Sequence, residues 1–300
     1  MHRQADPRNA RPIISVVVAD FNGWDQTRHC LAALQNSNFK EFEVILVDHG
    51  TTDETRQGLL LEFPRTIRVA GGQDLWWAGA TNLGIRTALE GNAQFIMLLN
   101  NDCNVKPDTI GILLGFSRKL PNAIVAPVQR ELSSGRYLCI TPRDLLLLGF
   151  PSWPGGPKNI TQEMRAQGVL PTRLISGGRG VLIPRSVFGT AGLLDEENLP
   201  HYCADHDFFF RCRTMNIPLY VAVNAEVYID DHRTSSANHI ERLSWREFFQ
   251  TLKDTRSHRN ITHLRVLFKK HYPVRFFYPV GLWLSILRYF TVYIVKRLQR

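Results

Sequence analysis

The sequence lacks any pair of cysteines at CxxC spacing, and its 5 cysteines are scattered along the chain. An odd number of scattered cysteines predicts neither a disulfide framework nor a thiolate zinc site. The amino-terminal residues 1–12 are polar and basic, without the apolar run of a secretory signal. We therefore expect residues 1–12 to form a polar tail and the protein to lie in a reducing, cytoplasmic compartment.

Two glycine-rich phosphate-binding motifs are also missing. A dinucleotide-binding protein has a GxGxxG turn directly after its first strand, whereas DFNGW at residues 20–24 follows the first apolar run here. No GxxxxGK[ST] motif is present, and the glycines within 177–180 precede an apolar run instead of joining a strand to a helix. These absences exclude a Rossmann dehydrogenase and a P-loop enzyme, so we expect phosphate to be bound through a metal ion.

The net charge of +9 is distributed unevenly. Residues 1–241 carry 23 Lys and Arg against 25 Asp and Glu, whereas residues 242–300 carry 13 against 2. The whole basic excess therefore belongs to the carboxyl-terminal part. Because aromatic residues are interleaved with the basic ones, this part fits an anionic membrane surface at least as well as a nucleic acid.

Apolar runs and helical patterns alternate through the first 126 residues. The predicted strands are 13–19, 43–47, 67–69, 95–99 and 123–126. The predicted helices are 25–35, 54–61 and 107–116, with a loop at 71–84 that leads into a helix ending at 89. Continuous β-branched runs are typical of strands buried on both faces of a parallel sheet. The alternation predicts an α/β fold with a doubly wound, mostly parallel sheet flanked by helices.

The second half of the chain is less regular. Prolines and glycines exclude a long regular element within 131–173, which we expect to form an excursion over the sheet. Beyond it, the pattern predicts helices from about 186 and over 205–215, and two closing strands at 219–223 and 225–229. This domain is expected to end near residue 236.

The segment 276–295 is mainly apolar and is bracketed by basic side chains. Its length permits a transmembrane helix. Pro279, Gly281 and especially Arg288 near its middle make a span costly, so an interfacial helix is favoured over a span. We predict that residues 237–300 are a helical region that associates with a membrane surface.

Three predicted strands end in carboxylates. Asp20, Asp48 and Asp102 follow the first, second and fourth strands, and the carboxyl ends of parallel strands meet at the edge where α/β proteins bind ligands. Crowded carboxylates favour a bound cation or a ligand that donates hydrogen bonds. Helix capping is the alternative for Asp20 and Asp48 taken singly.

A second acidic cluster contains Asp205 and Asp207, and His232 follows it. With Asp102, these side chains could hold a divalent cation and supply a base. The alternative for both acids is a stabilising position at the positive end of a helix. His232 taken alone is more often a solvated residue than a metal ligand.

Seven short motifs occur in one order along the chain. They are DFNGW at 20–24, VILVD at 44–48 with GTTD at 50–53, LWWAGATNLG at 75–84, LNND at 99–102, SGG at 176–178, DHD at 205–207 with Arg211, and His232. The ordered set resembles that of inverting family-2 glycosyltransferases of the GT-A fold, in the branch with bacterial rhamnosyltransferase-like enzymes. The resemblance implies a GT-A domain over 13–236, a polar tail over 1–12 and a carboxyl-terminal basic and aromatic helical extension over 237–300.

The resemblance also implies a site for a nucleotide-sugar donor, either dTDP- or UDP-linked. The residues implied in donor binding are Asp20, Asn22, Asp48, Trp76, Trp77, Asn82, Asn100, Asn101, Gly177 and Gly178. Asp48 would bind the pyrimidine base, and Trp76 and Trp77 would lie in a loop that lines the donor sugar.

Three further residues would carry the chemistry. By the same resemblance, Asp102 and His232 would bind Mn²⁺ or Mg²⁺, and Asp205 would be the general base that deprotonates the acceptor hydroxyl. The chain departs from the family pattern at three positions: Asn100 replaces the first acid of the DxD motif, His49 stands where many relatives have Asp or Asn, and Ala204 stands where Glu is usual.

These observations lead to a main hypothesis and two alternatives. We expect an inverting glycosyltransferase that moves a sugar, with rhamnose as a candidate, to a lipid-linked or glycan acceptor in bacterial cell-surface polysaccharide synthesis. It would lie peripherally at the inner face of the membrane, and residues 131–173 would help to select the acceptor. The first alternative is a non-catalytic relative that binds a nucleotide sugar or glycan. The second is nucleic-acid binding through the basic tail, which would fall steeply with salt; the main hypothesis includes no nucleic-acid partner.

Overall fold

The computed structural model describes residues 12–154, 156–230 and 240–299. Its strands are β1 (Ile14–Asp20), β2 (Phe42–Asp48), β3 (Ile67–Ala70), β4 (Phe95–Leu99), β5 (Cys103–Val105), β6 (Ile124–Glu131), β7 (Tyr137–Cys139), β8 (Arg143–Leu145), β9 (Phe150–Trp153), β10 (Val169–Pro171), β11 (Arg179–Pro184) and β12 (Leu219–Ile229). Its α-helices are α1 (Trp24–Gln35), α2 (Glu54–Glu62), α3 (Trp76–Glu90), α4 (Thr109–Lys119), α5 (Gln162–Gln167), α6 (Arg185–Ala191), α7 (Ala204–Thr214), α9 (Trp245–Thr251), α10 (Ile261–His271) and α11 (Tyr278–Leu298). Short 3₁₀ turns are η2 (Gln73–Leu75), η3 (Leu146–Leu148), η4 (Ile240–Arg242) and η5 (Arg275–Phe277).

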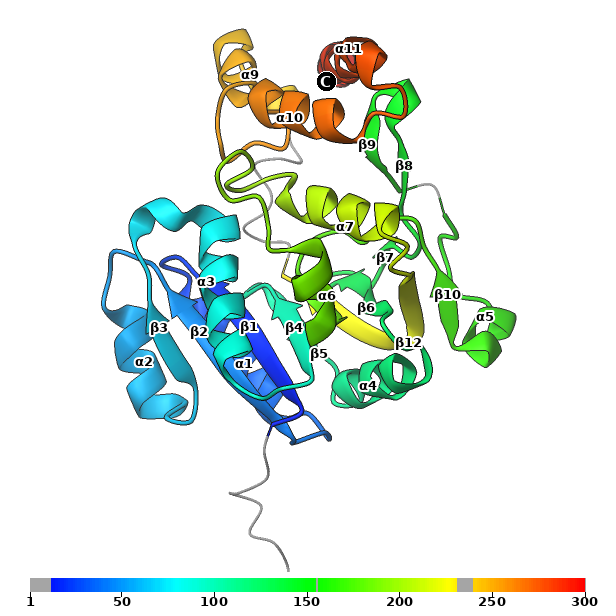
Figure 1. The fold of residues 1–300 in the computed structure, drawn as a ribbon. Helices are drawn as coiled ribbons and strands as arrows, with labels where there is room; N and C mark the ends of the chain where they lie inside the picture. Colours follow the sequence, from blue (N-terminus) through cyan, green and yellow to red (C-terminus); the bar gives the residue numbers. More distant parts are fainter. Residues whose placement is uncertain (1–11, 155, 231–239, 300) are drawn as a thin grey trace, which may run out of the picture.

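One curled sheet with helices on both faces dominates the molecule (Figure 1). Its strand order is β10-β12-β6-β11-β4-β1-β2-β3, with β5 paired to β12 and β7 to β6. Strand β1 runs parallel to β2 and β4, and its register places Asp20 beside Asp48. The strand order reverses between β1 and β4, and such a reversal opens a crevice at the carboxyl ends of the strands. The predicted α/β class is confirmed.

Strand β11 brings a distant segment to the same edge. It runs antiparallel to β4, with Arg179 opposite Leu99. The chain before β11 therefore reaches the point where β4 ends. The turn at 176–178 and the LNND motif at 99–102 consequently face each other, although the sequence separates them by more than 70 residues.

Two cores pack against the two faces of the sheet. Val16 and Val18 of β1 belong to the core shared with α1, α2 and α4, whereas Val17 belongs to the core shared with α3, α6 and α7. Burial on alternate faces explains why the strand reads as one continuous apolar run. Each fully buried side chain of this size contributes about 1.5–3 kcal/mol.

Two predicted boundaries are wrong. The predicted loop at 71–84 is helical from Trp76 onward, because small residues let α3 pack closely on the sheet; a side chain at Gly84 would collide with Val17 of β1. The two predicted closing strands are one strand, β12, whose register shifts between Ala222 and Glu226. The pairing of β12 with β6 is therefore irregular where the two predicted strands were separated.

The irregular segment 131–173 contains only elements of 3 to 6 residues, as expected. Strand β7 extends the main sheet beside β6, while β8 and β9 form a separate hairpin. Figure 1 shows this hairpin beside α11, well away from α1 and α2.

The carboxyl-terminal helices pack onto the sheet-bearing part. Ile240, Phe248 and Phe268 belong to the same core as α3 and α7. Helix α11 buries a stripe at four-residue intervals, made of Gly281, Ser285, Tyr289 and Tyr293. The expected domain end at residue 236 lies outside the described residues. Among the described residues, the segment Arg275–Leu298 is long and apolar enough to cross a membrane by length and composition alone.

Candidate active site

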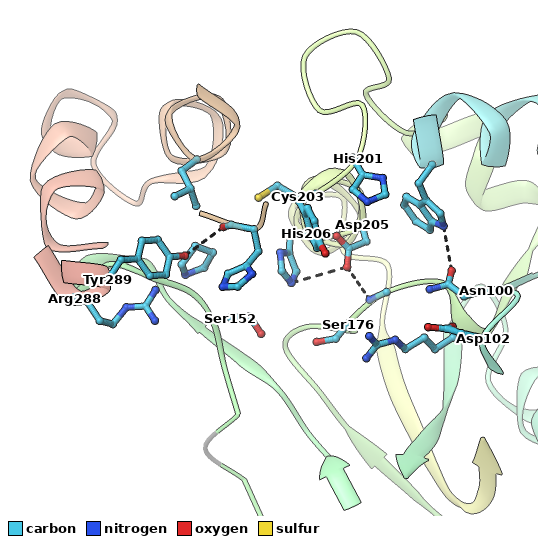
Figure 2. A pocket seen from close by; sticks show the side chains of 17 residues that line it. Asn100, Asp102, Ser152, Ser176, His201, Cys203, Asp205, His206, Arg288 and Tyr289 are labelled. Atoms are coloured by element: carbon cyan, nitrogen blue, oxygen red, sulfur yellow. Dashed lines mark hydrogen bonds and ion pairs between the residues drawn. The ribbon is translucent and has the colours of Figure 1, made fainter. Parts of the chain in front are cut away.

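A cavity of about 600 Å³ lies where the sheet edge, α7 and the carboxyl-terminal helices meet (Figure 2). Asn100 and Asp102 line it from the sheet edge, Trp77 lines it from α3, and Asp205 lines it from α7. The turn before β11 contributes Ser176, Gly177 and Arg179, and the hairpin and carboxyl-terminal helices contribute Pro151, Ser152, His258, Leu264, Arg288 and Tyr289. Segments that lie far apart in the sequence therefore build one site.

Asp20 organises the sheet edge from below. Its carboxylate is fully buried. Oδ1 accepts hydrogen bonds from Gly23 N at 3.1 Å, Thr27 Oγ1 at 2.6 Å and Asn101 Nδ2 at 3.0 Å, and Oδ2 accepts one from Thr55 Oγ1 at 2.6 Å. These bonds join the start of α1, the LNND motif and α2. Asp20 and Asn101 thus hold the loops in place and do not line the cavity.

Asn22 and Asp48 lie at the carboxyl ends of β1 and β2 and do not line the cavity. The Asn22 side chain accepts a hydrogen bond from Thr51 N at 2.7 Å and donates one to Thr51 Oγ1 at 2.8 Å, which ties the turn after β1 to the turn after β2. Asn22 adopts a left-handed backbone, with φ of 53°, as asparagine does more readily than most residues. Asp48 is almost fully buried and accepts a hydrogen bond from Arg68 Nε at 2.8 Å.

Trp77 and Asn100 line one side of the cavity, and Gly178 bonds to Asn100 through its backbone. Trp77 Nε1 donates to Asn100 Oδ1 at 3.1 Å, and Asn100 N donates to Gly178 O at 2.6 Å. A Cβ at Gly178 would stand 3.0 Å from the Trp77 ring, so glycine is required for this close approach. Trp76 points elsewhere: its ring packs against His201 at 5.9 Å between centroids, and the Arg256 guanidinium lies 5.6 Å above it.

The structure does not bring Asn82 to the cavity. Its side chain is buried, with Nδ2 donating to Leu194 O at 2.9 Å and Oδ1 accepting from Leu194 N at 3.0 Å. The nitrogen and the oxygen of the Asn82 amide therefore both hold the backbone at Leu194 against α3.

Asp102 and Arg179 stand together at the end of β4. Burial raises the pKa of Asp102, the positive charge of Arg179 works in the opposite direction, and the nearby negative charge of Asp230 adds to the rise. Arg179 Nη1 donates to Gln129 Oε1 at 2.9 Å, whereas its buried Nε has no hydrogen-bond partner among the described residues. A buried carboxylate and an available guanidinium nitrogen thus face one cavity.

The donor set at Asp102 fits a hard divalent cation that is shared with a bound substrate. Within the described part of the chain, no three His, Cys, Asp or Glu side chains form a metal cluster, and His232 lies outside the described residues. Mg²⁺ is commonly held by only one or two carboxylates together with substrate phosphates and water. Asp102 offers a single carboxylate whose negative charge is disfavoured by burial, which matches binding of a cation together with substrate phosphates.

Asp205 occupies the first turn of α7. Its Oδ2 accepts a hydrogen bond from Gly177 N at 2.7 Å and lies 3.9 Å from His206 Nε2. Gly177 has a φ of +73°, a left-handed conformation that glycine adopts at little cost. The positive end of the helix dipole favours the ionised carboxylate. Asp205 is therefore held in a fixed position at the cavity wall.

Asp207, two residues further on, has a structural role. Its carboxylate is fully buried and bonds to Arg211 Nε at 2.8 Å, His271 Nε2 at 2.8 Å and Lys270 Nζ at 3.1 Å. Burial works to raise the pKa of Asp207, but the hydrogen bond to His271 and the charges of Arg211 and Lys270 lower it to about 2. This cluster fastens α7 to α10.

Several cavity residues were missed in the sequence. Arg179 was hidden inside a glycine cluster, and Arg288 was noticed only as a charge that makes a membrane span costly. Burial and the charge of Arg256 lower the pKa of His201 to about 4, and burial with the charges of Arg259 and Arg288 does the same for His258. Nothing in the sequence pattern placed His258 or Arg288 near Asp205, because packing of the carboxyl-terminal helices brings them there.

Known proteins resemble this chain in sequence. A model of the family described as glycosyl transferase family 2 matches residues 15–176. The chain is 26% identical over 201 residues to the N-acetylglucosaminyl-diphospho-decaprenol L-rhamnosyltransferase of Mycobacterium tuberculosis (strain ATCC 25618 / H37Rv), covering 61% of this chain and 65% of that relative. The match thus spans slightly less than two thirds of that relative's length. An uncharacterized glycosyltransferase of Rickettsia prowazekii (strain Madrid E) is 22% identical over 251 residues, covering 80% of this chain and 73% of the relative.

Solved structures show the same fold. S. aureus TarS (residues 1–349) superposes with a TM-score of 0.57 at 14% identity, covering 96% of this chain and 92% of that one. GalNAc-T7 with UDP, GalNAc and Mn²⁺ superposes with a TM-score of 0.60 at 12% identity, covering 94% of this chain and 57% of that one. The predicted GT-A fold, with helices flanking the sheet and a carboxyl-terminal helical extension, is confirmed.

Proposed function

The chain belongs to glycosyl transferase family 2, and from this premise we propose that it transfers a sugar from a dTDP- or UDP-linked donor to a lipid-linked or glycan acceptor with inversion of configuration. The observation that carries the proposal is that Asp102 and Asp205, 103 positions apart in the sequence, line one cavity. Rhamnose is the candidate sugar, because the mycobacterial relative is named as a rhamnosyltransferase.

Inversion requires a single in-line displacement, with the acceptor oxygen and the leaving diphosphate on opposite sides of the reacting sugar carbon. Asp205 is the general base in this proposal: it removes the proton of the acceptor hydroxyl as the new bond forms. The Gly177 N–H holds this carboxylate in position. Inversion follows from having one displacement instead of two.

The leaving diphosphate lies at the opposite end of the cavity, beside Asp102 and Arg179. Arg179 offers a positive charge and a buried nitrogen without a hydrogen-bond partner among the described residues. A divalent cation bound at Asp102, Mn²⁺ or Mg²⁺, would neutralise the charge that develops on the departing diphosphate. The GalNAc-T7 neighbour, which was solved with UDP and Mn²⁺, supports this assignment.

The nucleotide lies along the β1–β2 edge in our proposal. Asp48 binds the base at the end of β2, and Asn22 shapes the turn next to it. Trp77 and Asn100 bound the donor sugar, with Gly177 and Gly178 closing the same wall. Asp20, Asn82 and Asn101 act indirectly, because their polar atoms hold the surrounding loops.

The exposed face of α11 lies on the membrane in this proposal. Phe276, Trp283, Leu287 and Leu298 are exposed on or just before this helix, and Lys296 and Arg297 follow at its end. Apolar and basic residues on one helix favour the surface of an anionic bilayer. The acceptor and the enzyme would then meet at the inner face of the cell membrane, and no nucleic acid is involved.

A donor panel tests the proposal. Purified protein is incubated with dTDP- and UDP-sugars, Mn²⁺ or Mg²⁺, and a short-chain lipid diphosphate acceptor, and the product is identified by mass spectrometry and NMR. We expect metal-dependent transfer with inversion at the anomeric carbon. Metal-dependent binding of UDP or dTDP without any transfer would favour a non-catalytic binding protein, for which the replacement of the first acid of DxD by Asn100 is the supporting feature. Retention of configuration would contradict the single displacement.

A further inference from the structure

Arg288 is an unusual residue for the middle of an apolar helix. It lines the cavity, and its buried Nε has no hydrogen-bond partner among the described residues. Its guanidinium lies 4.4 Å from the ring centroid of Phe150 and 4.6 Å from that of Tyr289. Two aromatic rings therefore position a positive charge for which the described part of the chain shows no carboxylate within ion-pair distance.

A partly buried arginine of this kind reduces stability unless a ligand supplies the missing hydrogen bonds. Burying part of a charged group without a hydrogen-bond partner is unfavourable. Arginine held against aromatic faces presents a rigid fork of donors that matches phosphate geometry. A phosphate bound in the cavity would supply the negative charge and the hydrogen-bond acceptors for this guanidinium.

The neighbours of Arg288 also suit an anion. Ser152 and His258 line the same cavity, and a serine hydroxyl and a neutral imidazole can each donate a hydrogen bond. The positive charge of Arg259 acts on His258 together with that of Arg288. The cavity carboxylates Asp102 and Asp205 come from the sheet edge and from α7 instead.

The position of Arg288 indicates that it contacts the acceptor and not the donor. Figure 2 shows Arg288 and Tyr289 on one side of the cavity and Asn100 and Asp102 on the other, with Asp205 between them. In a single displacement the acceptor approaches from the face opposite to the leaving diphosphate. If Asp102 marks the leaving group, the acceptor lies on the Arg288 side of Asp205.

We propose that Arg288, with Ser152 and His258, forms a subsite that binds a phosphate or diphosphate group of the acceptor. This inference rests on the proposed transferase function and goes beyond it by assigning the acceptor's anionic group to named residues. The apolar surface next to the subsite can accommodate a lipid chain, because Leu147 and Leu148 are exposed on η3, which packs against α11.

The experiment compares two acceptor probes in binding calorimetry. One is N-acetylglucosaminyl diphosphate carrying a farnesyl chain, and the other is a farnesyl glycoside of N-acetylglucosamine without phosphate. Arg288→Gln is compared with wild type and with Arg118→Gln, which removes an equal charge from an exposed position on α4. UDP with Mn²⁺ is titrated separately as the donor-side ligand.

We expect Arg288→Gln to weaken binding of the diphosphate probe by roughly 10- to 100-fold, since hydrogen bonds to charged groups are strong. The neutral probe and UDP should bind as in wild type, and Arg118→Gln should change nothing. Equal wild-type affinity for the two probes, or unchanged diphosphate binding in Arg288→Gln, would overturn the subsite. Loss of UDP binding in Arg288→Gln would assign the residue to the donor diphosphate instead.

Failure of the proposed function gives a different result, because wild-type protein would then transfer no sugar in the donor panel, whichever acceptor probe it binds. Circular dichroism checks the fold of each variant. Should Arg288→Gln not fold, Arg288→Lys retains the charge but loses the fork of donors, and its weaker diphosphate binding would carry the same conclusion.

Discussion

The two ends of the cavity are built in different ways. At the donor end, polar side chains at the sheet edge bond mainly to one another, as Asp20 does with Thr27, Thr55 and Asn101. At the acceptor end, Arg288 is held by aromatic rings from β9 and α11 and keeps a nitrogen free of hydrogen bonds to the described residues. The sheet edge is thus organised before any ligand arrives, whereas the acceptor end depends on how the carboxyl-terminal helices pack.

Asp205 lies between these two ends, so its removal should affect chemistry and neither binding event. We expect Asp205→Asn to lower kcat by about 10²–10⁴-fold, the usual contribution of a general base. The Kd of UDP with Mn²⁺ should stay within twofold of wild type. Steady-state kinetics and calorimetry on the same preparation give both values. A matched loss of UDP affinity would show that Asp205 serves the donor.

The Asp207→Asn variant tests whether the proposed acceptor end of the cavity depends on helix packing. Its lowered pKa, about 2 against an ordinary 3.8, corresponds to about 2 kcal/mol of folding free energy. Because the pKa of the folded state is the lower one, this stability is fully present above about pH 4 and is lost as the pH falls toward 2. We expect Asp207→Asn to be less stable than wild type in urea at pH 6, with the difference shrinking toward pH 2.5.

The control for this comparison is Asp53→Asn, which removes an exposed carboxylate that pairs with Arg56 at the surface. It should change stability by less than about 0.5 kcal/mol. In Asp207→Asn, binding of the diphosphate probe should also weaken more than binding of UDP. A stability difference that is the same at pH 6 and pH 2.5 would contradict the role given to the Asp207 cluster.

The smallest expected effect is on membrane binding by the exposed face of α11, outside the cavity. Trp283 is 71% exposed on α11, and Leu61 is 84% exposed on α2 at a distant part of the molecule. We expect Trp283→Ser to reduce cosedimentation with anionic vesicles by roughly 3- to 10-fold, because apolar surface is lost from the membrane contact. Leu61→Ser should have no effect on vesicle binding. Equal losses in both variants would mean that α11 is not the membrane-facing helix.

The sequence predicted the parallel strands β1 to β4, but it did not predict that the sheet is mixed, with β11 antiparallel to β4 and β6. Continuous apolar runs mark β1 and β4 because both faces of these strands are buried. The start of α3 was mistaken for a loop, since the small residues that allow close packing resemble a turn in a sequence. The misplaced start of α3 does not change which strand ends face the cavity.

The site residues fall into two groups: those at strand ends were predicted, and those placed by helix packing were not. Residues that end strands, such as Asp102, were placed correctly at the sheet edge because topology fixes their position. Asn82 was expected at the donor, yet its partner is the backbone of Leu194, 112 positions away. Arg288 could not be placed because its location depends on the packing of α11 against the β8–β9 hairpin, which no local pattern encodes.

One crossed binding measurement tests the two-ended cavity most directly. UDP with Mn²⁺ and the farnesyl diphosphate sugar are each titrated into Asp102→Asn and Arg288→Gln. The account predicts that Asp102→Asn loses the Mn²⁺-dependent gain in UDP affinity while keeping acceptor binding, and that Arg288→Gln does the reverse. Loss of the same ligand in both variants would contradict it.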